Sequence, residues 1–342
     1  MALGVRATPV VRSGTLAAPA LLTAVGLQHD HGFLAFDLQW FAGHHLPGYS
    51  PVFPPLGELV GPRVLGAAAA VASAALFALL AAGHWGIGAR AGVLWFAAAT
   101  LTELMIGRLT FALGVAVGLG ALLALQRGRP RLAGALAAGC AVSSPVAGLL
   151  LAMAGLALGL GERRGDGLWL AATAFVPAVL VAVAFPEGGR QPFGGVAAAF
   201  VLPTPMGSNA TRLLALFGGP LLLCALNGRG IGRRALVALL AFLVAYQWYG
   251  PLRELAKGAV DPSGRADYHR PLVEFLDRRL AAGQRVHVPS PRLHWEAVWV
   301  ARSHPLARGW ETQLDVKHNG VLRRRASPRP PTGAGSRNGA SA

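Results

Sequence analysis

"VLGAAAAVASAALFALLAAG", residues 64–83, is a run of twenty residues that contains no charged side chain. An α-helix rises about 1.5 Å per residue, so about 20 apolar residues are needed to cross the roughly 30 Å hydrocarbon core of a bilayer. The run therefore predicts a transmembrane helix, and the rest of the chain has to fit a fold that contains one.

The composition of the whole chain agrees with a membrane protein. Of its 342 residues, 54% are hydrophobic and 13% are charged, and the mean hydropathy is +0.48. Soluble domains carry about a quarter charged residues. The net charge of +16 would suit nucleic acid, but the cations form short arginine clusters between apolar runs, without interleaved aromatics. We therefore expect the lipid bilayer, and no nucleic acid, as the partner.

Arginine-rich turns separate the apolar runs and indicate the side of the membrane that each end occupies. The turns "RGRPR" (127–131), "ERRGDG" (162–167) and "GRGIGRR" (228–234) predict cytoplasmic loops, because such loops collect Lys and Arg. Dividing the runs between these turns predicts an all-α polytopic membrane bundle over residues 1–250, with about 8–9 membrane helices in the cell membrane.

The apolar run at residues 132–161 does not correspond to a whole number of full-length membrane helices. Residues 132–161 are too many for one span and too few for two full spans, and Ser143, Ser144 and Pro145 interrupt them midway. Proline removes a backbone donor and clashes with the preceding turn. We expect a short broken hairpin that enters and leaves from the cytoplasm and is buried in the bundle, because irregular backbone at membrane depth must be shielded from lipid.

The stretches that lie between the cytoplasmic turns predict extracytoplasmic segments. The first outer loop is expected at residues 28–62, where Lys and Arg are absent, and the second at residues 186–211. Residues 251–320 predict a partial α+β extracytoplasmic region, since "DYHRPLVEFLDRRLAAG" has an apolar helical face and "RVHVP" alternates like a strand. Residues 321–342 predict a disordered basic tail.

The first outer loop contains the residues that could carry chemistry. A carboxylate above a bundle opening can deprotonate a hydroxyl acceptor or hold a divalent cation against a phosphate, so Asp37 and Asp30 are the catalytic candidates. The substrate-binding candidates in the rigid, proline-rich segment "GHHLPGYSPVFPPLG" (43–57) are His44, His45 and Tyr49. The simpler interpretation is that Asp37 caps a loop helix and that the "HDH" triplet around Asp30 is only polar.

Two arginines and one asparagine are further substrate-binding candidates. Arg108 in "MIGRLTF" is expected at an outer helix end, where it could hold a lipid-linked phosphate through two hydrogen bonds or could simply extend to the interface. Asn209 and Arg212 in "GSNATR" could act in the same way from the second loop, or could form a turn and a helix N-cap. We expect Arg108 and Arg212 to face the same cavity as Asp37.

These residues invite a comparison with a known family. Asp37, followed by Trp40, Phe41 and "GYSPVFPPL" (48–56), resembles the first periplasmic loop of GT-C glycosyltransferases, polytopic enzymes that use polyprenyl-phosphate sugars. Together with "GRLTFALG", "SSPVAG", "PTPMGSNATRL" and "HWEAVWVARSHPLARGWETQLD", it is similar to a group of actinobacterial integral membrane proteins of GT-C-like architecture. The resemblance covers residues 28–320. It implies a glycosyltransferase, or a degenerate relative, that acts on a lipid-linked sugar at the extracytoplasmic face.

The sequence departs from that family in three places, one of which is a short second outer loop, as though a helical pair were missing between Phe193 and Pro203. Many GT-C enzymes have two adjacent acids where Asp37 is followed by Leu38, so no cofactor is firmly implied and a divalent cation remains one option. After "KHNG" (317–320) the chain becomes rich in Arg, Pro, Ser and Gly, so we expect a C-terminus truncated by a shifted reading frame. A transporter, supported by the Ser-Ser-Pro break, and a non-enzymatic membrane scaffold are the alternative functions.

Overall fold

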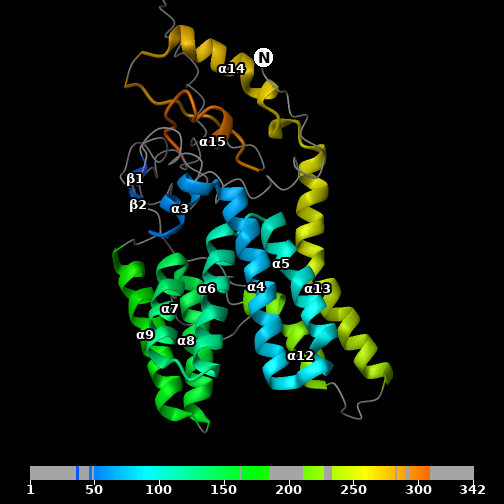
Figure 1. Cartoon of the computed structure of the whole chain (residues 1–342). Helices are drawn as coiled ribbons and strands as arrows, with labels where there is room; N and C mark the ends of the chain where they lie inside the picture. The colour runs from blue at the N-terminus through cyan, green and yellow to red at the C-terminus, as the bar shows by residue number, and fades with distance from the viewer. Residues whose placement is uncertain are drawn as a thin grey trace, which may run out of the picture.

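The long helices of the chain stand side by side and form a bundle (Figure 1). The computed structural model describes residues 36–37, 46–47, 50–161, 163–184, 211–226, 233–281, 283–289 and 293–308. Among these residues, three helices are long and apolar enough to cross a membrane: α4 (Pro62–Trp85), α6 (Leu109–Gln126) and α9 (Arg164–Ala184). The fold is therefore mainly helical and has membrane-length helices, as the apolar run at residues 64–83 predicts.

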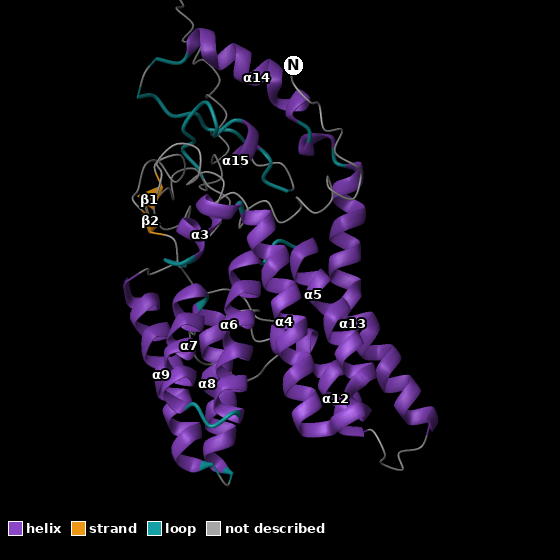
Figure 2. Ribbon diagram, viewed as in Figure 1, coloured by secondary structure: helices purple, strands orange, loops and turns teal. Residues whose placement is uncertain are grey.

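Further helical elements complete the bundle (Figure 2). They are α3 (Phe53–Val60), η2 (Gly86–Ala89), α5 (Arg90–Met105), α7 (Pro130–Ser143), α8 (Pro145–Leu160), α11 (Thr211–Leu213), the π-helix η4 (Leu214–Gly218), α12 (Gly219–Leu226) and α13 (Arg233–Val260). The helices α4, α7 and α8 each begin at a proline, which lacks the N–H that a first turn leaves unbonded. Within the described residues, the three membrane-length helices do not support the expected count of about 8–9, and turns at glycine and proline leave α5, α7 and α8 with 14–16 residues each.

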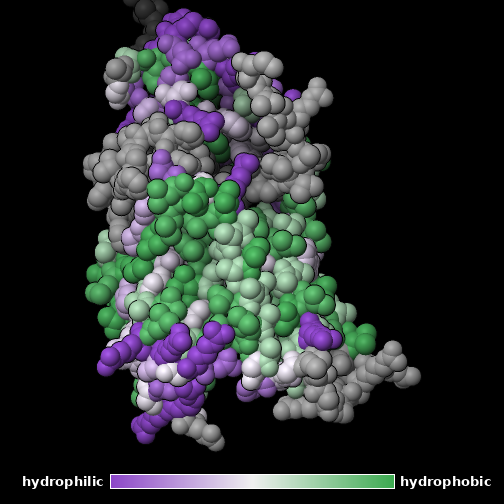
Figure 3. Space-filling model, viewed as in Figure 1, coloured by the Kyte–Doolittle hydropathy of each residue, from purple (hydrophilic) through white to green (hydrophobic). Residues whose placement is uncertain are grey.

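The chain reverses direction between successive helices, so its turns gather at two opposite ends. Figure 1 places α3 at one end, and the α6–α7 and α8–α9 turns at the other. We call these the α3 end and the basic end. In Figure 3 an apolar band lies between hydrophilic surfaces at the two ends. This distribution suits a molecule with hydrocarbon around its middle and polar groups at its ends.

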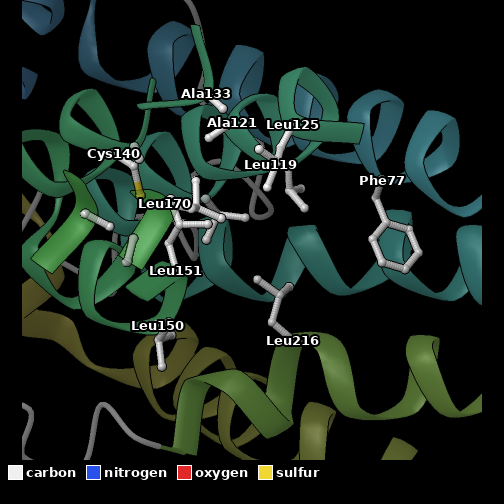
Figure 4. Packing of buried hydrophobic residues seen from close by; sticks show 14 of the residues in the cluster. Phe77, Leu119, Ala121, Leu125, Ala133, Cys140, Leu150, Leu151, Leu170 and Leu216 are labelled. Atoms are coloured by element: carbon white, nitrogen blue, oxygen red, sulfur yellow. The ribbon is translucent and has the colours of Figure 1, made fainter. Parts of the chain in front are cut away.

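Small residues let the helices pack closely. A Cβ atom at Gly155 would lie 2.6 Å from the backbone nitrogen of Ala171, and one at Gly167 would lie 2.6 Å from the carbonyl oxygen of Gly155. The helices α8 and α9 are therefore in backbone contact, which is typical of helix pairs in membranes. Larger side chains such as Phe77 and Leu216 belong to the buried core of the bundle (Figure 4).

The break expected at residues 143–145 is present. The helix α7 ends at Ser143, Ser144 is extended (φ −157°, ψ 110°), and α8 begins at Pro145. The Ser144 hydroxyl accepts a hydrogen bond from the backbone N–H of Ala147 at 3.5 Å. This N-cap satisfies one of the free N–H groups that begin α8.

The C-terminal part of the described chain is helical. It contains η5 (Pro262–Gly264), α14 (Ala266–Arg279) and α15 (Glu296–Trp299) around a small core that includes Leu276 and Trp295. The expected α+β character is not supported. The "RVHVP" segment contributes only an isolated parallel bridge between Val286 and Leu306, because no second strand among the described residues pairs with it.

Candidate functional site

Arg108 lies at the α3 end of the bundle, in the turn that joins α5 to α6. Gly107 adopts a positive φ of 64°, and the backbone N–H of Arg108 donates to the carbonyl oxygen of Glu103 at 2.9 Å. The Arg108 Nη1 atom also lies 3.5 Å from Glu103 Oε1. The Glu103 side chain is only 4% exposed, whereas that of Arg108 is 36% exposed. The buried carboxylate therefore anchors a guanidinium that is still open to solvent or ligand.

Arg212 reaches the same helix from a distant part of the sequence. Its guanidinium carbon lies 4.9 Å from the ring centroid of Phe111, within the range of a cation–π contact. Phe111 is buried on α6, one turn beyond Arg108. The structure thus brings the two predicted arginines to the first two turns of α6. Because the N-terminus of a helix carries a partial positive charge, this region is suited to bind an anion.

The proline-rich segment covers this region. Ser50 is buried, and its hydroxyl donates to the carbonyl oxygen of Ser143 at 2.5 Å. Phe53 is 1% exposed and packs against Leu109, the first residue of α6. The segment from Ser50 onward therefore lies against both the α7–α8 break and the start of α6.

Most of the other predicted site residues fall outside the described residues: Asp30, His44, His45, Tyr49 and Asn209. Asp37 belongs to β1 (Phe36–Asp37), which pairs antiparallel with β2 (Leu46–Pro47). In this register Asp37 is opposite Leu46, next to His45 in the sequence. The backbone of the catalytic candidate therefore lies beside the proline-rich segment.

Two acidic residues were missed as site candidates. Within the described part of the chain, Glu58 Oε2 and Glu103 Oε2 are buried and have no hydrogen-bond partner. Glu58 is on α3, and Glu103 is one turn before the Arg108 turn. An acid inside an apolar run, just before a glycine turn and an arginine, is the sequence signal that could have identified Glu103.

A metal site is not evident in the part of the chain that the structure describes. No group of three or more His, Cys, Asp or Glu side chains there is arranged to hold a metal ion. Cys140 and Cys224 are both buried and unpaired as thiols.

A second polar cluster surrounds His269 in the C-terminal region. His269 is buried, and its Nε2 atom lies 3.0 Å from the carbonyl oxygen of Ser263. Burial lowers the pKa of His269 below 6.5, although the Ser263 carbonyl, Glu296 and Asp261 each act to raise it. Neutral imidazole is thus the form that the folded C-terminal region favours.

This lowered pKa predicts an acid-sensitive C-terminal region. Below about pH 6.5 the unfolded chain binds a proton at His269 more readily than the folded chain, so the free energy of unfolding should fall as the pH decreases. Hydrogen exchange of residues 262–279 at pH 7.5 and 5.5 would measure the loss of protection. His269→Gln should weaken the pH dependence, whereas replacing the exposed His287 by glutamine should leave it intact. Equal protection at both pH values would contradict the prediction.

In comparisons with known proteins, no family model, curated protein or solved structure matches the chain. The assignment of function therefore rests on the residues themselves.

Proposed function

We propose that this chain is a multi-pass membrane glycosyltransferase of the GT-C type, or a degenerate relative, that acts on a polyprenyl-phosphate sugar at the α3 end. The observation that carries the proposal is the convergence of Arg108 and Arg212 on the first turns of α6, beside the segment that begins at Ser50. Two cations and a helix N-terminus are suited to a phosphate group that remains attached to a lipid.

The orientation in the cell membrane follows from the charges at the two ends. The arginine turns of the basic end are the cytoplasmic loops, which makes the α3 end and the C-terminal region extracytoplasmic. The full bundle has about 8–9 membrane helices in this proposal. Besides the three long helices, apolar segments at Pro145–Leu160 and Leu214–Leu226 support further membrane passages.

The proposed reaction transfers the sugar from the lipid phosphate to a hydroxyl acceptor. A carboxylate, Asp37 or Asp30, takes the proton of the acceptor hydroxyl as its oxygen bonds to the anomeric carbon. The bond between that carbon and the phosphate oxygen breaks, and polyprenyl phosphate leaves with the bonding electron pair. Arg108 and Arg212 would stabilise the negative charge that develops on the leaving phosphate.

Binding of decaprenyl phosphate to the full-length protein in lipid nanodiscs would test this proposal. Arg212→Ala should weaken binding by about tenfold or more, because a charge-assisted hydrogen bond contributes about 1.5–3 kcal/mol. Arg253→Ala removes an exposed arginine of α13 and should have no effect. Equal affinity of the wild type and Arg212→Ala would refute the assignment of the phosphate site.

Transport is less well supported. A transporter needs polar groups that are available along a path through the bilayer. At the α7–α8 break the Ser143 hydroxyl donates to the carbonyl oxygen of Gly139, and the Ser144 hydroxyl caps α8. The Ser50 hydroxyl donates a hydrogen bond to the carbonyl oxygen of Ser143. The polar groups at the α7–α8 break therefore form hydrogen bonds within the fold, and these bonds would have to break before the groups could bind a transported substrate.

A further inference from the structure

Two turns at the basic end form one cationic surface. Five exposed arginines lie in the α6–α7 and α8–α9 turns or at the beginning of α7 and α9: Arg127, Arg129, Arg131, Arg163 and Arg164. We call this set the basic patch. The Arg163 Nη2 atom donates to the carbonyl oxygen of Leu125 at 3.3 Å, which joins the α8–α9 turn to the end of α6. The hydrophilic surface below the apolar band in Figure 3 includes this end of the molecule.

The charge of the basic patch is not balanced within these turns. Their acids are Glu162 and Asp166, and Asp166 is paired with Arg163 at 2.6 Å. The helices α7 and α9 also begin here, so their positive helix ends add to the charge of the arginines. The patch is therefore complementary to an anion that comes from outside the chain.

The surface next to the basic patch is apolar. Trp169 is 50% exposed, and its indole N–H donates to the carbonyl oxygen of Pro130, which fixes the ring beside the patch. Leu132 and Leu168 are also exposed there. Tryptophan is enriched at the level of the lipid headgroups. A ligand that suits both surfaces must have an anionic group and a hydrocarbon chain.

We infer that the basic patch binds the headgroup of an anionic phospholipid of the cytoplasmic leaflet, with the acyl chains against Trp169 and the neighbouring leucines. Arginine clusters beside membrane helices attract anionic lipids in this way. The inference rests on the membrane insertion proposed above and is independent of sugar transfer at the α3 end.

Lipid binding to the purified full-length protein in a neutral detergent, measured by native mass spectrometry, would test the inference. Phosphatidylglycerol should bind about tenfold or more tightly than phosphatidylcholine, because each arginine near an anionic surface contributes about 1 kcal/mol. Raising the salt from about 0.1 M to 0.5 M should reduce this preference through screening. Equal binding of the two lipids would overturn the inference.

Variants separate the basic patch from other cations. Replacing Arg127, Arg129 and Arg131 together by glutamine should reduce the preference to about twofold or less, since three of the five charges are lost. The matched control replaces three exposed arginines of α13 and α14, Arg253, Arg278 and Arg279, and should keep the preference. Arg212→Ala should also keep it, so a failure here differs from a failure at the α3 end. Full displacement of phosphatidylglycerol by inorganic phosphate would show an anion site without lipid selectivity and would refute the proposal.

Discussion

Replacing Gly167 by alanine is expected to destabilise the bundle by about 3 kcal/mol, near the upper end of the usual cost of overpacking. The added Cβ would overlap the backbone nitrogen of Gly159 and would lie 2.6 Å from the carbonyl oxygen of Gly155. Both obstacles are backbone atoms, so no side chain can rotate away and α8 and α9 have to separate. The melting temperature of the purified protein should fall by roughly 6–12 °C.

The control for this prediction lies two residues earlier on the same helix. A Cβ atom at Gly165 would meet no atom within 4 Å. Alanine there should leave the melting temperature unchanged or slightly higher, because alanine is a better helix former than glycine. A similar loss of stability in both variants would indicate that helix flexibility, and not close contact of α8 with α9, explains the effect of Gly167→Ala.

Local sequence signals predicted much of the bundle. The apolar run at residues 64–83 became α4, and the arginine-rich "RGRPR" and "ERRGDG" segments lie where α7 and α9 begin. Ser143 and Pro145 mark a real break. These features succeed because hydropathy, proline and glycine act over a few residues, and because a helix needs about 20 apolar residues to cross a bilayer.

Contacts between distant residues could not be read in this way. Arg212 forms a cation–π contact with Phe111, about a hundred residues away in the sequence. Ser50 is hydrogen-bonded to Ser143, from which it is separated by 93 positions. The expected count of about 8–9 membrane helices is not supported by the three membrane-length helices among the described residues. Packing between helices decides such details, and a single sequence does not encode it locally.

Removal of the Arg108 guanidinium is expected to affect both stability and phosphate binding. In Arg108→Ala the Glu103 carboxylate loses its cation while it remains buried, which costs about 3–5 kcal/mol for a fully buried pair. Because the Arg108 side chain is 36% exposed and the two atoms are 3.5 Å apart, we expect about 2 kcal/mol. Thermal unfolding in detergent would measure this loss, and Arg63→Ala, at an exposed position of α4, should cause none.

A second substitution separates the structural effect from the binding effect. Glu103→Gln removes the buried negative charge, so the double variant Glu103→Gln/Arg108→Ala should recover most of the stability that Arg108→Ala loses. The affinity for decaprenyl phosphate should stay at least about tenfold below that of the wild type, because the double variant still lacks the guanidinium that would hold the phosphate. If affinity returns together with stability, Arg108 serves only to neutralise Glu103, and the phosphate must be bound elsewhere.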